Sequence, residues 1–233
     1  SEQKNVEDLF FEYIRILRGT MPKVFVAENV SGLAKGTAKG YLNEILRDFR
    51  ASGYQVSCKI LDAKWLGVPQ SRNRAIFVGV RNDLWRPEYL GKLHPSPSDK
   101  IVTLKRAFSG LIFSDQDNIE TDIKKYSVYK LLQDVPMGQA HPKRFSLKKA
   151  HPNSYSQCIT ATNGSIGAAN ACHWENRAFT VSEVKRIMSV PDDYVLTGKY
   201  QQQVERLGRM VAPLMMKAVA ENICNLGVFH ANT

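Results

Sequence analysis

A short apolar run that ends abruptly in an acid and an amide constrains this chain more than any other feature. Residues 24–27, Val-Phe-Val-Ala, are continuously apolar and partly β-branched, and Glu28 and Asn29 follow at once. Such a run predicts a strand buried on both faces of a parallel sheet. Ligands of open α/β sheets bind beyond the carboxyl ends of the strands, where Glu28 is expected. The alternative is that Glu28 caps the next turn or pairs with a lysine.

The segments around this run alternate between helix and strand. Apolar residues at helical spacing predict a helix over 7–19 and a second helix over 38–51. Residues 54–63 and 74–80 have the composition of strands. A strand–helix–strand order indicates an α/β fold.

Later parts of the chain have a different texture. Residues 85–154 are punctuated by proline and show weak periodicity, which predicts a small separate lobe of short strands and loops. Thr180 and Glu183 have the spacing of a capping box, which predicts a helix start. A last helical region is expected over 201–225, interrupted around Gly208 and Pro213.

Composition limits the class of partner. The chain has 233 residues and a formal net charge of +10, which fits a polyanion such as nucleic acid, although a basic but otherwise ordinary enzyme is the alternative. No apolar run approaches a membrane span and no signal peptide opens the chain, so a cytoplasmic location is expected.

The cysteines do not indicate a metal site. They lack C-x-x-C spacing. Cys172 and His173 are adjacent, and adjacent side chains rarely bind one metal ion together.

The stretch GVPQSRNRAIFVGV places Gln70, Arg72 and Arg74 at alternate positions. On extended backbone, alternate side chains point to the same side. Guanidinium forks suit phosphate and carboxylate groups. A solvated strand edge has a similar pattern, so this motif alone leaves both interpretations open.

Together these motifs resemble those of the DNA cytosine-5 methyltransferase family. VFVAENVSGL resembles the family's ENV motif and GVPQSRNR its Gln-x-Arg-x-Arg motif. NRAFTVSEVKRIMSVPDDY resembles the motif after the target-recognition region, RLGRMVAPLMMKAVAENI the final helix motif, and DLFFEYIRIL the segment before ENV. The blocks follow the family's order and cover nearly all of the chain outside residues 85–154.

The resemblance implies a chemistry. The target cytosine leaves the duplex, a cysteine thiolate adds to ring carbon 6, and carbon 5 takes the methyl group of S-adenosyl-L-methionine. Nucleophile addition puts negative charge into the ring, and a proton donor at ring N3 offsets that charge. The resemblance assigns this role to Glu28 of the ENV motif, beside Asn29. Arg74 would hold the base oxygen and orient the acid, and Gln70 and Arg72 would bind substrate, Arg72 at a flanking phosphate.

The resemblance also implies double-stranded DNA as partner and S-adenosyl-L-methionine as methyl donor. Leu9 and Val211 fall where the family borders the cofactor, although a core leucine is an equal alternative for Leu9. The variable lobe should read the DNA, through phosphate contacts and groove packing. Its candidate residues, for which a solvated basic face is the alternative, are Lys124, Lys125, Tyr126, Tyr129, Lys130, Lys143, Arg144, Phe145, Lys148 and Lys149.

The family's nucleophile has no counterpart here. In the family it follows a proline, in a loop before the helix that corresponds to residues 7–19. The residues that precede the four cysteines are Ser57, Gln157, Ala171 and Ile223. The family's glycine-rich cofactor loop is also absent. We therefore expect this chain to be the carboxy-terminal portion of such an enzyme. It should be inactive without the missing N-terminal portion or a partner subunit. An exposed face could also make the chain a homodimer.

These expectations define a fold, a division into segments and two alternative functions. The fold would be α/β: the later half of a doubly wound, Rossmann-like methyltransferase sheet plus a small mixed target-recognition lobe. Residues 1–84 would continue the catalytic domain, 85–154 would form the recognition lobe, and 155–233 would close the catalytic domain. The expected context is bacterial or phage-like restriction–modification. The alternatives are a non-catalytic DNA-binding module derived from such an enzyme and, less favoured, an RNA methyltransferase homologue.

Overall fold

The computed structural model describes residues 2–34, 38–113, 121–165 and 171–230. They divide into two compact units. The first unit comprises Ser1–Leu61, Asn73–Ser96 and Ala218–Thr233, and the second comprises Asp62–Arg72 and Pro97–Lys217. This division differs from the predicted segments 1–84, 85–154 and 155–233, because the chain enters the second unit already at the hairpin 62–72 and leaves it again within its last long helix.

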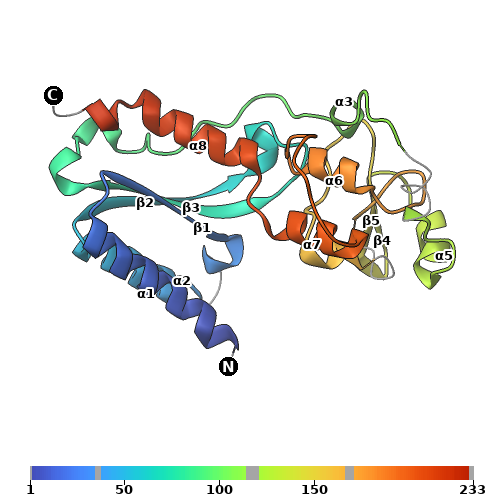
Figure 1. The fold of residues 1–233 in the computed structure, drawn as a ribbon, viewed down its shortest axis with the longest axis horizontal. Helices are drawn as coiled ribbons and strands as arrows, with labels where there is room; N and C mark the ends of the chain where they lie inside the picture. The colour runs from blue at the N-terminus through green and yellow to red at the C-terminus, as the bar shows by residue number, and fades with distance from the viewer. Residues whose placement is uncertain (1, 35–37, 114–120, 166–170, 231–233) are drawn as a thin grey trace. The chain divides into compact units, whose positions relative to one another are not determined.

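The first unit is a three-stranded sheet between helices. Its elements are α1 (Glu2–Thr20), β1 (Val24–Val30), α2 (Ala38–Ala51), β2 (Tyr54–Asp62) and β3 (Asn73–Arg81). The strand order is β1-β3-β2. Helices α1 and α2 cover one face, and the part of α8 (Pro213–Asn225) from Ala218 onward covers the other (Figure 1). The predicted helices and strands of this region are confirmed.

The direction of β1 against its neighbour differs from the prediction. β1 pairs with β3 in antiparallel register, with Phe25 opposite Gly79 and Val30 opposite Arg74. Only Phe25 of β1 is buried, so the expectation of burial on both faces beside a parallel neighbour is wrong for this pair. An apolar run predicts a buried segment but does not predict the direction of the neighbouring strand. In the described chain, the other edge of β1 has no strand partner.

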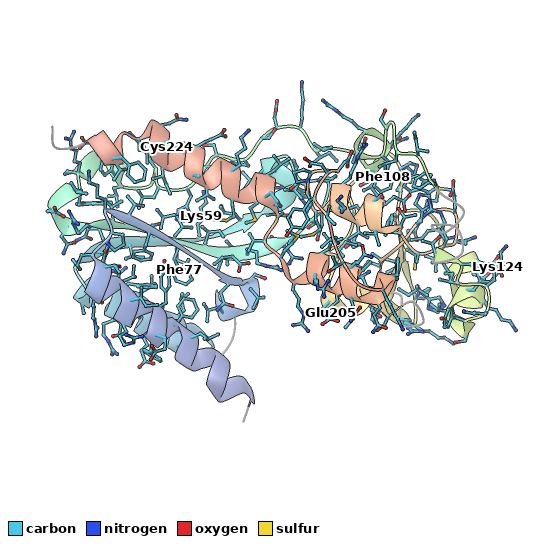
Figure 2. All side chains as sticks on the ribbon, viewed as in Figure 1. Lys59, Phe77, Phe108, Lys124, Glu205 and Cys224 are labelled. Atoms are coloured by element: carbon cyan, nitrogen blue, oxygen red, sulfur yellow. The ribbon has the colours of Figure 1, made fainter. Side chains whose placement is uncertain are left out.

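Aromatic packing holds the helices on the sheet. Phe77 of β3 points from the sheet toward α1 and α2 (Figure 2), and its ring centroid lies 5.6 Å from that of Phe10 and 5.9 Å from that of Phe49. The Phe25 ring packs 4.6 Å from Phe49 and lies directly over Gly79, where a Cβ would come within 2.1 Å of it. Each such buried ring stabilises the fold by about 1.5–3 kcal/mol.

The second unit is a small mixed structure. Its helices are α3 (Leu104–Ala107), α5 (Ser127–Gln133), α6 (Val181–Ile187), α7 (Tyr200–Arg209) and the start of α8. Its strands are β4 (Ala140–His141), β5 (Arg144–Lys149) and β6 (Ala171–Cys172), in the order β4-β5-β6. β5 pairs antiparallel with β4 and parallel with β6. The predicted break in the last helical region is confirmed between α7 and α8.

The predicted capping box starts α6. The Thr180 hydroxyl accepts from the Glu183 backbone N–H at 3.0 Å, and the Glu183 carboxylate accepts from the Thr180 N–H at 2.8 Å. Glu183 is fully buried, and Arg177 donates to both of its oxygens at 2.8 Å. Burial and the nearby Arg177 charge lower the pKa of His173 to about 2, so this buried imidazole is neutral. This cluster anchors a helix.

The α7 helix crosses another backbone segment at Gly208 with no room for a side chain. A Cβ at Gly208 would lie 2.3–2.6 Å from backbone atoms of Thr160 and Ala161. We predict that Gly208→Ala lowers the thermal unfolding midpoint by about 3–10 °C, because overpacked backbone costs about 1–3 kcal/mol. Gly19→Ala in α1, where a Cβ meets open space, is the control and should keep or raise the midpoint. Equal midpoints for the two variants would contradict this packing.

Candidate active site and nucleic-acid interface

Glu28 and Arg74 form an ion pair at the end of β1. Arg74 lies opposite Val30 in the β1–β3 register, and Val30 is two residues from Glu28 on the same face of the strand. The diagonal arrangement brings Arg74 Nε to 2.7 Å from Glu28 Oε1. The Arg74 side chain is 13% exposed and the Glu28 side chain 25%, so the pair is largely shielded from water but a ligand can still reach it.

Each member of this pair keeps a polar atom available. Arg74 Nη1 donates to the Asn73 carbonyl at 2.8 Å. Within the described part of the chain, neither Arg74 Nη2 nor Glu28 Oε2 has a hydrogen-bond partner. In its protonated form, a carboxyl O–H beside a guanidinium N–H can donate to a ligand that offers an acceptor nitrogen next to a carbonyl oxygen, which is the edge that cytosine presents at N3 and O2.

Asn29 supports the end of the strand. Its carboxamide oxygen accepts a hydrogen bond from the Val30 backbone N–H at 2.7 Å. Such local side-chain to backbone bonds favour a turn over continued strand. The bond holds the backbone next to Glu28, and a direct catalytic role for Asn29 stays a prediction.

Gln70 and Arg72 share a side, as their alternation predicts, but that side is buried. Gln70 Oε1 accepts from the Ile159 backbone N–H at 2.8 Å, and Arg72 Nη1 donates to the Ile159 carbonyl at 2.8 Å. Gln70 Nε2 also donates to the Ile187 carbonyl at the end of α6, at 3.4 Å. The two side chains therefore join the segment around Ile159 to a helix end.

Arg72 extends this junction to α7. Its Nη2 donates to the carbonyls of Gly208 and Met210, each at 2.9 Å, and its side chain is among the largest fully buried ones. Three helix-end or loop carbonyls thus accept from one guanidinium. This placement is contrary to the predicted phosphate contact of Arg72 and to substrate binding by Gln70, because neither side chain reaches solvent in this structure.

Asp62 organises the hairpin that carries these residues. Its carboxylate accepts from the backbone N–H groups of Lys64 and Arg72, at 3.3 and 2.9 Å, and from the Ser71 hydroxyl at 3.0 Å. Sequence reasoning missed Asp62. The available signal was an Asx-type turn, since aspartate after a strand often bonds the backbone two residues on.

Two of the four cysteines, Cys58 and Cys172, lack the surroundings of an activated nucleophile. Burial raises the pKa of Cys58 to about 11 and that of Cys172 to about 12, so both thiols stay protonated at neutral pH. The Cys158 sulfur lies 3.3 Å from Arg72 Nη1, within the structural junction, and Cys224 is exposed on α8.

The two predicted cofactor residues lie in different units. Leu9 is 64% exposed on α1, so the alternative of a core leucine is wrong. Val211 is half-buried between α7 and α8. An exposed leucine fits an apolar part of a cofactor, and both roles stay predictions.

The recognition-lobe candidates divide by exposure. Lys143 is exposed in the turn between β4 and β5, Arg144 is half-exposed at the start of β5, and Phe145 is 77% exposed. Lys124, just before α5, projects outward (Figure 2). Lys149 differs, because it is buried. Exposed cations beside an exposed ring fit contacts to a phosphate backbone and to bases.

Comparison with known proteins shows the family of this chain. Residues 1–225 match the family of C-5 cytosine-specific DNA methylases. The chain therefore belongs to the C-5 cytosine-specific DNA methylase family. It is 31% identical to the type II methyltransferase M1.HphI of Haemophilus parahaemolyticus, over 94% of this chain and 61% of that protein. It is 30% identical to M.NgoFVII of Neisseria gonorrhoeae, over 97% of this chain and 64% of that protein.

Solved structures show the same fold. The crystal structure of the Dnmt2 methyltransferase of S. pombe aligns with a TM-score of 0.63 at 15% identity, over 94% of this chain and 72% of that one. EhMeth of Entamoeba histolytica aligns with a TM-score of 0.62 at 16% identity, over 88% and 63%. The chain thus spans about three fifths of the length of the first two curated relatives. Within the described residues, no helix is both long and apolar enough to cross a membrane.

The contacts of Arg72 in the buried junction predict that this residue contributes to the stability of the fold. Arg72→Lys should lower the free energy of unfolding by about 3 kcal/mol, because an ammonium cannot reach all the carbonyls that the fork satisfies. Arg209→Lys, on the exposed face of α7 beside Glu205, is the matched control and should change stability by less than about 0.5 kcal/mol. Urea unfolding measures both. If Arg72→Lys left stability unchanged but weakened DNA binding, Arg72 would contact a DNA phosphate, as first predicted, and would not hold the buried junction.

Proposed function

We propose that this chain is part of a DNA cytosine-5 methyltransferase and supplies the acid–guanidinium pair that receives the flipped cytosine. The observation that carries the proposal is the Glu28–Arg74 ion pair, 2.7 Å at its closest, at the end of a sheet strand. Family membership supports this reaction class, and the closeness of the two side chains supports Glu28 and Arg74 as the groups that would meet the base edge.

In this proposal each residue has a distinct task. Glu28 Oε2 faces ring N3 and shares a proton with it as charge develops in the ring. Arg74 Nη2 donates to the base oxygen, while its Nε keeps the carboxylate in place. Such preorganised groups stabilise charge that forms only in the transition state. S-adenosyl-L-methionine, when bound, supplies the methyl group, and the exposed Leu9 would border it.

Catalysis by this chain is proposed to need a nucleophile from elsewhere. None of the four cysteines follows a proline, and burial keeps Cys58 and Cys172 protonated. The free edge of β1 and the exposed apolar residues Leu9 and Ile16 on α1 would be covered by a further segment of the protein or by a partner subunit.

Double-stranded DNA is the proposed substrate. The exposed cations of the recognition lobe, Lys143 and Arg144 among them, would contact its phosphates. A bacterial or phage modification enzyme is the proposed context.

Glu28→Gln tests this assignment. The assay is labelled methyl transfer from S-adenosyl-L-methionine to unmethylated duplex DNA, with this chain mixed with a separately made N-terminal half of a relative that carries the Pro-Cys loop. Activity should fall by about a hundredfold or more, because the amide cannot share a proton at N3. DNA affinity should be unchanged.

Glu12→Gln on the exposed face of α1, where Glu12 pairs with Arg15, is the matched control and should retain full activity. An equal loss of DNA affinity and activity in Glu28→Gln would show that the acid serves binding. Tight DNA binding without methyl transfer in every mixture would favour the non-catalytic DNA-binding module.

A further inference from the structure

The sheet of the first unit has a second open edge, on β2. In the strand order β1-β3-β2, β2 has β3 on one side and, within the described residues, no strand on the other. It is 9 residues long, whereas strands most often have about five or six. An unpaired strand of this length presents a row of backbone donors and acceptors to any extended segment that reaches it.

Backbone bonds at the two ends of β2 show which residues face this open edge. The Asn82 N–H donates to the Gly53 carbonyl at 2.9 Å, and the Ala63 N–H donates to the Arg72 carbonyl at 3.1 Å. β2 and β3 therefore run antiparallel, with the backbone of Gly53 and Ala63 directed toward β3. Because these groups alternate sides along a strand, the even-numbered residues direct their N–H and C=O outward. The central ones are Val56, Cys58 and Ile60.

Those outward backbone groups are available. Outside the sheet ladder, no hydrogen bond between described residues uses the backbone of Val56, Cys58 or Ile60. Three N–H groups and three C=O groups in sequence can pair with about five residues of an added strand.

A groove runs along the same edge. It has a volume of about 470 Å³, within the range of about 300–1,000 Å³ that ligand sites occupy. Its floor is β2, which contributes Gln55, Val56, Ser57, Cys58 and Ile60. Consecutive strand residues alternate between the two faces of a sheet, so a groove lined by a run of them follows the strand edge.

One wall of the groove is a stripe of α2. Leu42, Leu46 and Arg50 line it, and their spacing of four residues puts them on one side of the helix. The side chains of Val56 and Cys58 face the same way, because they pack with α2 against the aromatic core of the unit.

The other wall is the segment 85–93, on the α8 side of the sheet (Figure 1). Trp85, Leu90 and Leu93 line the groove from this side. The segment is tied to α8 by Asn222, whose side chain donates to the Lys92 carbonyl at 2.9 Å. The groove is therefore walled above and below the sheet edge, which leaves room for a single extended segment.

Apolar surface in this groove is left open to solvent. Leu90 is 77% exposed and Ile60 is 39% exposed. Both faces of an added strand would meet apolar side chains, those of α2 on one face and those of 85–93 on the other. An occupant with apolar side chains on both of its faces would bury this surface.

Charge selects among extended occupants. The described residues that line the groove include the cation Arg50 and no aspartate or glutamate. Arg50, Lys59 on β2 and Lys92 beside Leu93 are all exposed, and none has an ion pair with another described residue. Three uncompensated cations around one groove complement carboxylates on the occupant.

The same charges disfavour a second copy of this chain as occupant. An antiparallel pair of two β2 strands would bring Lys59 and Arg50 of one copy toward those of the other. The formal net charge of +10 adds to that repulsion at long range. The groove suits a partner of opposite charge.

We propose that the open edge of β2 docks an extended, apolar segment of a partner protein that carries carboxylates, and that this segment joins the sheet as a further strand. Main-chain bonds to Val56, Cys58 and Ile60 would hold it, and the apolar walls with Arg50 would select its side chains. The site is distinct from the Glu28–Arg74 pair and from the open edge of β1.

N-methylated peptides test the strand pairing on the wild-type chain. The probe is a fluorescent, end-blocked peptide of about seven residues, with valine and threonine in the middle and a glutamate at each end. Its binding is followed by fluorescence anisotropy. Two further versions carry N-methyl groups on alternate backbone amides, one version on each edge of the peptide.

One N-methylated version should bind at least about tenfold more weakly than the unmodified peptide, because it has lost the donors that face β2. The other should bind within about threefold, because its methyl groups face away from β2. Equal affinity of the two versions would overturn strand pairing, and no binding of the unmodified peptide would overturn the site.

A charge exchange tests the groove side chains. Arg50→Glu should weaken binding of the unmodified peptide by about tenfold, and a peptide with lysine in place of each glutamate should regain that affinity. Arg47→Glu is the matched control, since Arg47 is exposed on the same helix and does not line the groove. An equal effect of the two substitutions would contradict a contact at Arg50.

Light scattering decides the identity of the occupant. The chain should have the same mass with and without the peptide's binding partner surface occupied, apart from the mass of the peptide itself. A dimer that the unmodified peptide dissociates would overturn the acidic partner and assign the edge to a second copy. None of these assays contains DNA or S-adenosyl-L-methionine, so their results are independent of the proposed function.

Discussion

The buried guanidinium of Arg72 is the interaction on which the second unit depends. It joins the carbonyls of Ile159, Gly208 and Met210, and it does so where α7 passes too close to the 160–161 backbone for any side chain. Asp62 holds the Arg72 backbone, and Gln70 ties the same segment to the end of α6. A planar fork with five donors suits such a junction, because one side chain satisfies several buried carbonyls at once.

Two residues further on, the same stretch of chain serves the other unit. Arg74 lies on β3, and the β1–β3 register places it diagonally across from Glu28. The alternation of Gln70, Arg72 and Arg74 therefore combines two tasks: the first two side chains hold a fold together, and the third orients an acid. A substitution in this short segment affects either the stability of the second unit or the Glu28–Arg74 ion pair, depending on which of the three residues it changes.

Much of this could be predicted from the sequence. The helices α1 and α2, the strands, and the Thr180–Glu183 capping box follow from local patterns, and the ENV-like and Gln-x-Arg-x-Arg-like stretches indicated the family. Local patterns could not show that Gln70 and Arg72 face inward, because their partners, such as Ile159 and Gly208, are distant in sequence. The antiparallel β1–β3 pair and the burial of Lys149 are likewise set by tertiary packing, which periodicity does not encode.

We propose that this chain holds the acid and the guanidinium of a cytosine-5 methyltransferase but not its nucleophile. The most direct measurement is labelled methyl transfer to unmethylated duplex DNA by this chain alone and by the chain mixed with the segment that carries the Pro-Cys loop. Labelled methyl groups should appear in DNA only with the mixture. Transfer by the chain alone would contradict this proposal, because one of Cys58, Cys158, Cys172 or Cys224 would then have to be the nucleophile.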